Sequence, residues 1–280
     1  MNKKCCNSGP LTFFFLIFLI FIFLFDMKNI AGRHKFILDK LHEEGNLNVI
    51  NLYKELKVSS VTIRKDLKLL EEKGLLFRTH GGATLRNPYT IDRPVNEKEK
   101  LQASEKSKIG LLAAQLIEPN DSIIIASGTT VMALAKNIQN KQNLTVITSA
   151  LNVALELIQH PEIEVLQLGG ILRKSSSSVT GPYAQNVLAD FSCTKLFLGV
   201  DGIDLEFGLT TTNGMEAHLN KQMIEASQKV IVLSDSTKFG KRGFGKICGL
   251  ENVDRIITDS GISEHFVTQL KNLGIEVTIV

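Results

Sequence analysis

From residue 108 to the C-terminus, short apolar runs rich in β-branched residues alternate with segments of helical period. The runs that predict strands are Ser122–Ala126, Leu144–Thr148, Val165–Leu168, Lys195–Gly199, Lys229–Leu233, Arg255–Thr258 and Glu276–Ile279. The helical segments are Ile109–Ile117, Thr130–Ile138, Asn152–Gln159, Tyr183–Leu188, Glu216–Ala226 and Ser263–Leu273. Strands this apolar are buried on both faces, so the pattern predicts an α/β domain around a mainly parallel sheet.

The preceding stretch, residues 27–86, predicts a smaller domain of a different kind. Helices are expected over Ile30–Glu44 and Val49–Leu56, and a third from Ser59 or Ser60 to Lys73. A short strand (Leu75–Arg78) and a turn (His80–Ala83) follow. Three helices and a β-wing in under sixty residues indicate a winged helix-turn-helix. Residues 27–90 carry twelve Lys/Arg against seven Asp/Glu, net +5, whereas residues 91–280 carry eighteen against twenty-one, net −3. A basic head on a mildly acidic body suggests that the head meets a polyanion.

The third predicted helix has the distribution of a DNA recognition helix. Such a helix exposes polar and basic residues near its N-terminus while its other face packs on its own domain. Here Ile63, Leu67 and Leu70 face inward. The candidate DNA contacts are Ser59, Ser60, Thr62, Arg64, Lys65, Lys68 and, on the wing, Arg78. The pattern alone also fits a basic amphipathic helix whose charges are simply solvated.

Loops rich in Gly, Ser and Thr follow the predicted strands of the larger domain. The first, Ser127-Gly128-Thr129-Thr130, precedes a helix and could hold a phosphate with backbone N–H groups and hydroxyls, although an ordinary N-cap explains it equally well. Loops at the carboxyl ends of strands in an open α/β sheet converge on one pocket. The other candidate ligand contacts are Asn152, Gly170, Arg173, Asp201 and Lys238. Asp201 could instead belong to a simple turn, and Lys238 could be a solvated loop cation.

The head and the loops together resemble the DeoR family of transcription regulators. Arg33, Ile37 and Leu41 are each separated by three residues, and Ser59 follows after seventeen more. Thr62-Ile63-Arg64-Lys65-Asp66-Leu67 and Arg78-Thr79-His80-Gly81-Gly82-Ala83 complete the similarity in the head. The resemblance extends from about Arg33 to the C-terminus.

This resemblance implies a repressor of a carbohydrate operon that binds a double-stranded DNA operator and is controlled by a phosphorylated sugar. It implies a sensor domain related in fold to ribose-5-phosphate isomerase, in which Ser127–Thr130 hold the phosphate and Lys238 approaches the sugar. Residues 198–206, followed by Glu216-Ala217 and Leu219-Asn220, look closest to the N-acetylgalactosamine-operon repressor branch. That similarity points to an amino-sugar or hexose phosphate. No cofactor is expected.

An enzyme with a DNA-binding head is the rival interpretation. Asp201, Asp204 and Glu216 could move protons in a sugar-phosphate isomerase or deaminase, and Asp201-Gly202-Ile203-Asp204 resembles the isomerase's aspartate pair. The second aspartate is followed by Leu205 rather than by an acid, and no glycine-rich stretch like the isomerase's precedes Glu216. The sequence therefore favours a binding pocket over catalysis.

The N-terminal segment, the linker and the cysteines complete the expected organisation of the chain. Residues 11–25 are a nearly unbroken apolar run, too short for a spanning helix, and contain seven of the fifteen Phe. We expect Met27 to be the true start, with a membrane-tethered regulator as the alternative. Residues 87–107, with Pro88, Pro94 and many Lys and Glu, suggest a linker, and 108–280 the effector-sensing domain. The four cysteines lack zinc-ligand spacing, so no metal is expected. A cytoplasmic homo-oligomer, dimer or tetramer, is predicted.

Overall fold

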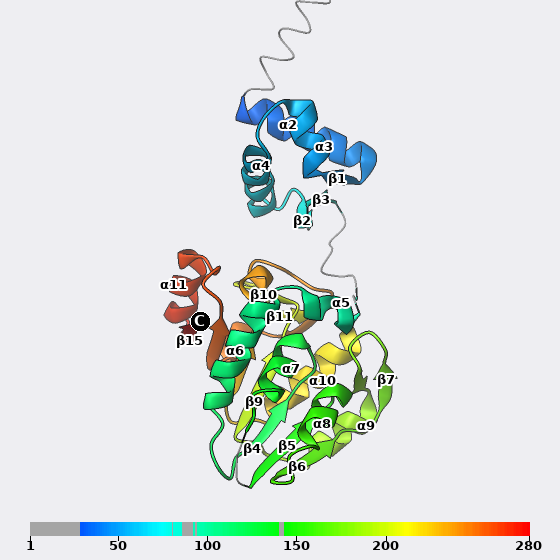
Figure 1. Ribbon diagram of the computed structural model, residues 1–280, viewed down its shortest axis with the longest axis vertical. Coiled ribbons are helices and arrows are strands. Elements are labelled where there is room, and N and C mark those ends of the chain that lie inside the picture. Colours follow the sequence, from blue (N-terminus) through cyan, green and yellow to red (C-terminus); the bar gives the residue numbers. More distant parts are fainter. Residues whose placement is uncertain (1–28, 80, 86–91, 93, 140–142) are drawn as a thin grey trace, which may run out of the picture. The chain divides into compact units, whose positions relative to one another are not determined.

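The structure is a computed structural model and describes residues 29–79, 81–85, 92, 94–139 and 143–280. The chain forms two compact units that divide between Pro88 and Tyr89 (Figure 1). The apolar run at 11–25, and with it the expected start at Met27, lies outside the described residues. Within the described part of the chain no helix is both long and apolar enough to cross a membrane.

The first unit is a winged helix-turn-helix, as predicted. Its elements are α2 (Ile30–Glu44), β1 (Asn46–Asn48), α3 (Val49–Leu56), α4 (Ser60–Glu72), β2 (Phe77–Thr79) and β3 (Gly82–Thr84). The three helices share one apolar core, which includes Ile37, Leu52 and Ile63. The strands form an antiparallel sheet in the order β1-β3-β2. β1 was not predicted, because three residues are too few to show an alternating pattern.

The second unit is built on a seven-stranded sheet in the order β15-β14-β12-β9-β4-β5-β6, with every neighbouring pair parallel. The strands are β4 (Ser122–Ile125), β5 (Leu144–Thr148), β6 (Ile163–Gln167), β9 (Lys195–Gly199), β12 (Val230–Leu233), β14 (Arg255–Thr258) and β15 (Glu276–Ile279). All seven predicted strands are confirmed, and with them the predicted α/β class.

Helices cover both faces of this sheet. α6 (Ala103–Gln115), α7 (Thr129–Ala135) and α8 (Leu151–Leu157) share one apolar cluster with Ile123 and Ile125. α9 (Pro182–Leu188), α10 (Gly214–Glu225) and α11 (Glu264–Asn272) share another with Ile124. Successive residues of β4 thus face opposite clusters, which is the period of a strand buried on both sides.

Short antiparallel pieces were not predicted. β10 (Gly202–Asp204), β11 (Gly208–Thr211) and β13 (Gly245–Cys248) form one small sheet, and β7 (Ile171–Arg173) pairs with β8 (Ser178–Thr180). The stretch expected to be a linker also differs from expectation. In its described part it holds α5 (Val95–Lys100) and the start of α6, both within the second unit. Its Lys- and Glu-rich composition resembles that of a solvated connection, yet Lys106 lies on the buried face of α6.

Candidate DNA-binding surface and ligand pocket

α4 presents one basic stripe to solvent. Ile63, Asp66, Leu67 and Leu70 are buried, while Arg64, Lys65 and Lys68 are exposed beside Val61. Positions 61, 64, 65 and 68 lie three or four residues apart, so their side chains share one face of the helix. Three of the seven predicted DNA contacts, Arg64, Lys65 and Lys68, therefore lie together on the solvent side of α4.

Two of the selected hydroxyls have a structural task as well. Ser59 is the N-cap of α4: its Oγ accepts a hydrogen bond from the Thr62 backbone N at 3.1 Å and lies 2.9 Å from Thr62 Oγ1. Ser60 begins the helix and is half-buried. Arg78, on β2, has a half-exposed guanidinium 3.9 Å from Glu71 of α4, and its backbone N donates to the same carboxylate. The wing strand is thereby tied to the end of the candidate recognition helix.

A buried ion pair joins α2 to α4. Arg33 Nε lies 2.8 Å from Asp66 Oδ2, and Arg33 Nη2 donates to Asp66 Oδ1 at 3.0 Å. Proximity to Asp66 raises the pKa of Arg33 although burial opposes it. A bidentate pair fixes the relative orientation of its two groups better than a single bond does. This pair orients the helix that carries the basic stripe.

The second unit holds a cavity of about 100 Å³ at the carboxyl ends of the central strands. Part of its lining comes from the ends of three strands. Ser127–Thr130 follow β4, Gly199 ends β9 and is followed by Val200 and Asp201, and Asp235, Thr237 and Lys238 follow β12. The chain runs from β4 to one edge of the sheet through β5 and β6, and β9 then lies on the other side of β4. The cavity therefore sits at the topological switch point, where open α/β sheets bind ligands.

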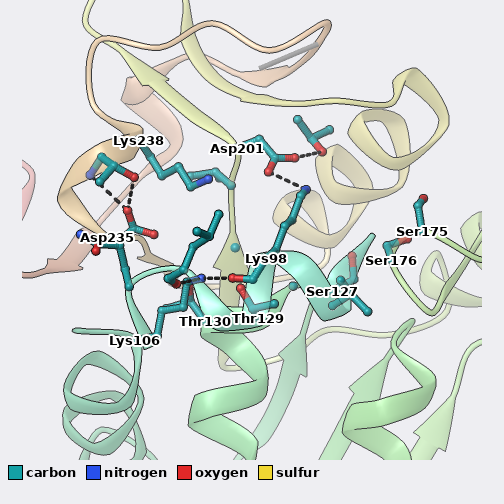
Figure 2. A pocket seen from close by; sticks show the side chains of 18 of the residues that line it. Lys98, Lys106, Ser127, Thr129, Thr130, Ser175, Ser176, Asp201, Asp235 and Lys238 are labelled. Carbon is teal, nitrogen blue, oxygen red and sulfur yellow. Dashed lines mark hydrogen bonds and ion pairs between the residues drawn. The ribbon is translucent and has the colours of Figure 1, made fainter. Parts of the chain in front are cut away.

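Three lysines line this cavity from three elements: Lys98 of α5, Lys106 of α6 and Lys238 after β12 (Figure 2). Burial lowers the pKa of Lys106 to about 8, and the neighbouring Lys98 and Lys238 act in the same direction while Asp235 opposes them. Lys106 Nζ donates to the carbonyl oxygens of Lys98 at 2.6 Å and of Leu101 at 2.5 Å. These three ammonium groups could bind an anion, and the lining also holds the carboxylates of Asp92, Asp201, Glu216 and Asp235.

Carboxylates occupy the same cavity. Asp201 Oδ1 accepts from Lys98 Nζ at 2.9 Å, and Oδ2 from Thr211 Oγ1 at 3.1 Å. Burial would raise the pKa of Asp201, but Lys98 and Lys238 hold it below its ordinary value. Glu216 at the start of α10 accepts from Ser127 Oγ at 2.7 Å and pairs with Arg173. Burial raises the pKa of Glu216 even beside that arginine. The cavity can therefore hold an anion at one place and accept hydrogen bonds from hydroxyls at another.

The structure brings most of the predicted ligand residues together. Six of the nine line the cavity: Ser127, Gly128, Thr129, Thr130, Asp201 and Lys238. Arg173 lies behind the lining, bonded to Asp92 and Glu216, both of which face the cavity.

Asn152 and Gly170 do not line the cavity. The side chain of Asn152 accepts from the backbone N of Val153 at the start of α8. Gly170 has φ +147°, and a Cβ there would lie 2.5 Å from Thr180 O, so this glycine serves the close approach of β7 and β8. Turn chemistry explains both residues without a ligand.

Sequence reasoning missed Lys98 and Lys106. Both fall in the Lys- and Glu-rich stretch that suggested a linker, where a lysine carries no distinguishing mark. Lys106 did have a signal: it stands three and four positions before Ile109 and Gly110 on the buried face of α6. A lysine in register with an apolar helix face needs a buried partner or a ligand. In the described residues no group of three or more His, Cys, Asp or Glu is placed to hold a metal ion.

Two family models match the chain. The DeoR-like helix-turn-helix domain matches residues 33–88, and the DeoR C terminal sensor domain matches residues 101–260. The chain belongs to the DeoR family of transcription regulators. The resemblance noted from the sequence is confirmed. The basic stripe lies in the matched DNA-binding domain of this DeoR-family chain, and most of the cavity lining lies in its matched sensor domain.

Curated relatives match most of the chain. The "Putative aga operon transcriptional repressor" of Escherichia coli O157:H7 is 36% identical over 90% of this chain and 96% of its own length. The HTH-type transcriptional repressor GlcR of Bacillus subtilis is 34% identical over 87% and 93%. Among solved structures, ribose 5-phosphate isomerase A of Methanocaldococcus jannaschii matches 49% of this chain and 55% of its own, with 16% identity and a TM-score of 0.38.

Proposed function

We propose that this DeoR-family protein represses a carbohydrate operon and releases its operator when a phosphorylated sugar binds the cavity at the switch point. One observation carries the proposal: three lysines and a Ser-Gly-Thr-Thr loop converge on one cavity within a DeoR sensor domain. The two relatives named above are called repressors, one of them of the aga operon. The protein would act in the cytoplasm, where its DNA is.

The basic stripe of α4 is the proposed DNA contact. Arg64, Lys65 and Lys68 are exposed on one face, and an arginine that reaches a guanine edge discriminates bases while lysines bind phosphates. Ser60 and Arg78 add contacts at the helix start and on the wing. Ser59 and Thr62 fix the N-terminus of the helix through the cap described above and contact DNA from there. We propose a homo-oligomer, dimer or tetramer, because two-fold helix-turn-helix proteins place paired recognition helices in successive major grooves.

The sugar phosphate would bind with its two ends at different parts of the cavity. Ser127–Thr130 begin α7 with Gly128 as N-cap, and no side chain of the described residues caps this helix. Its free backbone N–H groups, with Lys106 and Lys238, are the proposed phosphate site. Asp201 and Glu216 would accept from sugar hydroxyls or from an amino group. A ligand of this kind is an amino-sugar or hexose phosphate.

The first experiment is fluorescence anisotropy of the full chain on DNA upstream of its own gene, at fixed salt because phosphate contacts are salt-dependent. Glucosamine 6-phosphate, glucose 6-phosphate and ribose 5-phosphate are added separately. Specific binding that one of them reverses is the expected result. Specific binding that none of them changes would refute the proposed effector class and leave the DNA-binding surface standing.

Two substitutions separate the two surfaces. Arg64→Ala should weaken specific DNA binding and leave the thermal shift caused by the phosphosugar intact. Lys238→Ala should abolish the thermal shift caused by the phosphosugar and leave specific DNA binding intact. Its matched control is Lys271→Ala, which removes an exposed lysine from α11. If Lys238→Ala responded to the phosphosugar as the control does, the cavity would not be the effector site.

A sugar-phosphate isomerase or deaminase is the second candidate function. One observation favours it: Asp201 and Glu216 share the cavity, and their pKa values move in opposite directions, as in acid/base pairs of enzymes. Asp204 opposes it, since it pairs with Arg242 at 2.8 Å and does not line the cavity. We propose that the cavity binds without turnover. Conversion of ribose 5-phosphate or glucosamine 6-phosphate above the buffer rate, lost in Glu216→Gln, would establish the enzyme instead.

A further inference from the structure

The cavity has one wall that does not come from a strand end. Asp92 and residues 94–102, which we call the strap, contribute Val95, Lys98, Leu101 and Gln102 besides Asp92 itself. The strap consists of Asp92, α5 and the junction into α6, where Gln102 takes the left-handed conformation at φ 51°. In the chain it comes shortly after the DNA-binding unit, which ends at Pro88.

Polar bonds hold the strap to the sensor. Asp92 bonds to Arg173 Nη2 at 2.6 Å, to Ser175 Oγ at 2.5 Å and to Thr212 Oγ1 at 3.2 Å. The backbone N of Val95 donates to Ser175 O at 2.6 Å. Lys98 reaches across to Asp201, as Figure 2 shows. These bonds tie the strap to three separate parts of the cavity.

Apolar packing adds little to this attachment. None of the six residues of α5 is buried, and Leu101, which ends the helix, is 42% exposed. A helix this short without a buried face has no stability of its own in water. Glu99 pairs with Lys136, the residue after α7, at 3.2 Å, outside the cavity lining. The bonds of Asp92 and Lys98, by contrast, face the cavity, where a charged or hydroxylated ligand can exchange them.

The partners of the strap are groups that a phosphosugar would use. Asp201 is the proposed acceptor for sugar hydroxyls, and Lys98 already donates a hydrogen bond to it. Glu216 is tied through Arg173 to Asp92. Lys98 Nζ lies 2.9 Å from Asp201 Oδ1, so a sugar hydroxyl that donates to this oxygen takes the place of the Lys98 ammonium group.

We propose that the strap is the element through which the effector acts: the phosphosugar displaces Lys98 from Asp201 and Asp92 from Arg173, and the released strap frees the DNA-binding unit from its operator-binding arrangement. This rests on the proposed function, since it names how that same cavity regulates DNA binding. The ligand favours the released state because its hydroxyls and phosphate replace bonds that only the docked strap makes. Such a difference in binding between two states is what allosteric coupling requires.

The strap can be released without any ligand. In the full chain, the double variant Asp92→Asn with Lys98→Gln removes the two ion pairs that face the cavity, leaves the pair of Glu99 with Lys136 in place, and keeps the size of the side chains. Amide hydrogen exchange at residues 95–101 should become at least tenfold faster, while exchange in β4 stays unchanged and reports an intact sheet. The variant should bind its upstream DNA at least tenfold more weakly with no sugar present. Lys100→Gln, which removes an exposed lysine from the same helix, should match the wild type in both measurements.

Ligand experiments on the wild type separate this proposal from the proposed function. A phosphosugar that binds, as seen by slower exchange at residues 127–130, should speed exchange at 95–101 to the level of the double variant. Binding that slows or leaves unchanged the exchange at 95–101 would overturn the strap and leave the effector site standing. If none of the three phosphosugars binds, the proposed function fails and the strap loses its role with it. A double variant with wild-type exchange and wild-type DNA affinity would also overturn the strap.

Discussion

Replacing Asp66 by alanine should strongly destabilise the DNA-binding unit and leave the stability of the sensor unchanged. Asp66 does not belong to the exposed basic stripe, because it lies on the buried face of α4. Its side chain is only 4% exposed, and that of its partner Arg33 is 8% exposed. His34 Nε2 also lies 3.3 Å from Asp66 Oδ1. The substitution leaves the Arg33 guanidinium buried without the carboxylate that it was paired with.

The expected cost is large compared with the stability of the unit. Removing one partner of a buried ion pair costs about 3–5 kcal/mol, because the remaining charge stays out of water. Domains are stable by roughly 0.05–0.15 kcal/mol per residue, so a unit of about sixty residues has about 3–9 kcal/mol in total. The variant therefore loses at least a third of that stability and in the lower range all of it.

Hydrogen exchange across a urea series of the full chain measures this directly. Amides around Ile37 and Leu67 report the first unit, and amides in β4 report the second. In Asp66→Ala the first set should lose protection at much lower urea, while the second set keeps its wild-type midpoint. Specific DNA binding should be lost at the same lowered urea concentration, although Asp66 is not on the exposed face of α4.

A double variant tests the reasoning. Arg33→Met with Asp66→Leu removes both charges and fills the space with apolar side chains, so it should be markedly more stable than Asp66→Ala alone. If Asp66→Ala lowered the unfolding free energy of the first unit by less than about 1 kcal/mol, the pair would behave as a solvated surface bridge and the argument from burial would fail.

Three further outcomes are expected. Arg64→Ala should weaken specific DNA binding by about 1–3 kcal/mol, roughly five- to 150-fold, and narrow the gap between operator and random DNA, as anisotropy would measure; an equal loss on both DNAs would make Arg64 a phosphate contact only. The charged form of Lys106 attracts anions and its pKa is about 8, so affinity for inorganic phosphate should fall as the pH rises from 7.5 to 9.5. Calorimetry on Lys106→Met should show weaker phosphate binding that does not change over this pH range. If the affinity of the variant fell with pH as in the wild type, another group would be titrating. Gly82→Ala would place a Cβ 1.8 Å from Leu47 O, where β3 pairs with β1, so the wing must shift and DNA affinity should fall. Wild-type DNA affinity in this variant would show that the wing does not contribute to binding.

Local periodicity accounts for what the sequence predicted correctly. A strand buried on both faces is apolar at every position, and a helix packed on it is apolar every third or fourth position, so both can be recognised within about ten residues. The seven parallel strands and the three helices of the head were found in this way. The recognition helix was found because its exposed and buried residues separate cleanly at positions such as Arg64 and Ile63.

The short antiparallel strands were missed because they lack the continuous apolar run of the parallel strands. β1, β7, β10 and β11 have no such run, and they are strands because a partner strand is present. β5 and β6 were predicted without knowledge of their neighbours, whereas β1 needs β3, which lies more than thirty residues later. Pairing of this kind is a property of the fold and leaves no local pattern.

The sequence by itself determined that this chain has a DNA-reading head and an α/β sensor with polar loops at its strand ends. Only the tertiary structure decided which of those loops share a cavity, and Asn152 and Gly170 do not line it. It also placed Lys98 and Lys106 beside the Ser127–Thr130 loop and closed one wall with the strap. The physical reason is the reach of a hydrogen bond: Arg173 is bonded to residues 81 positions before it and 43 after it, and no pattern read along the chain brings such partners together.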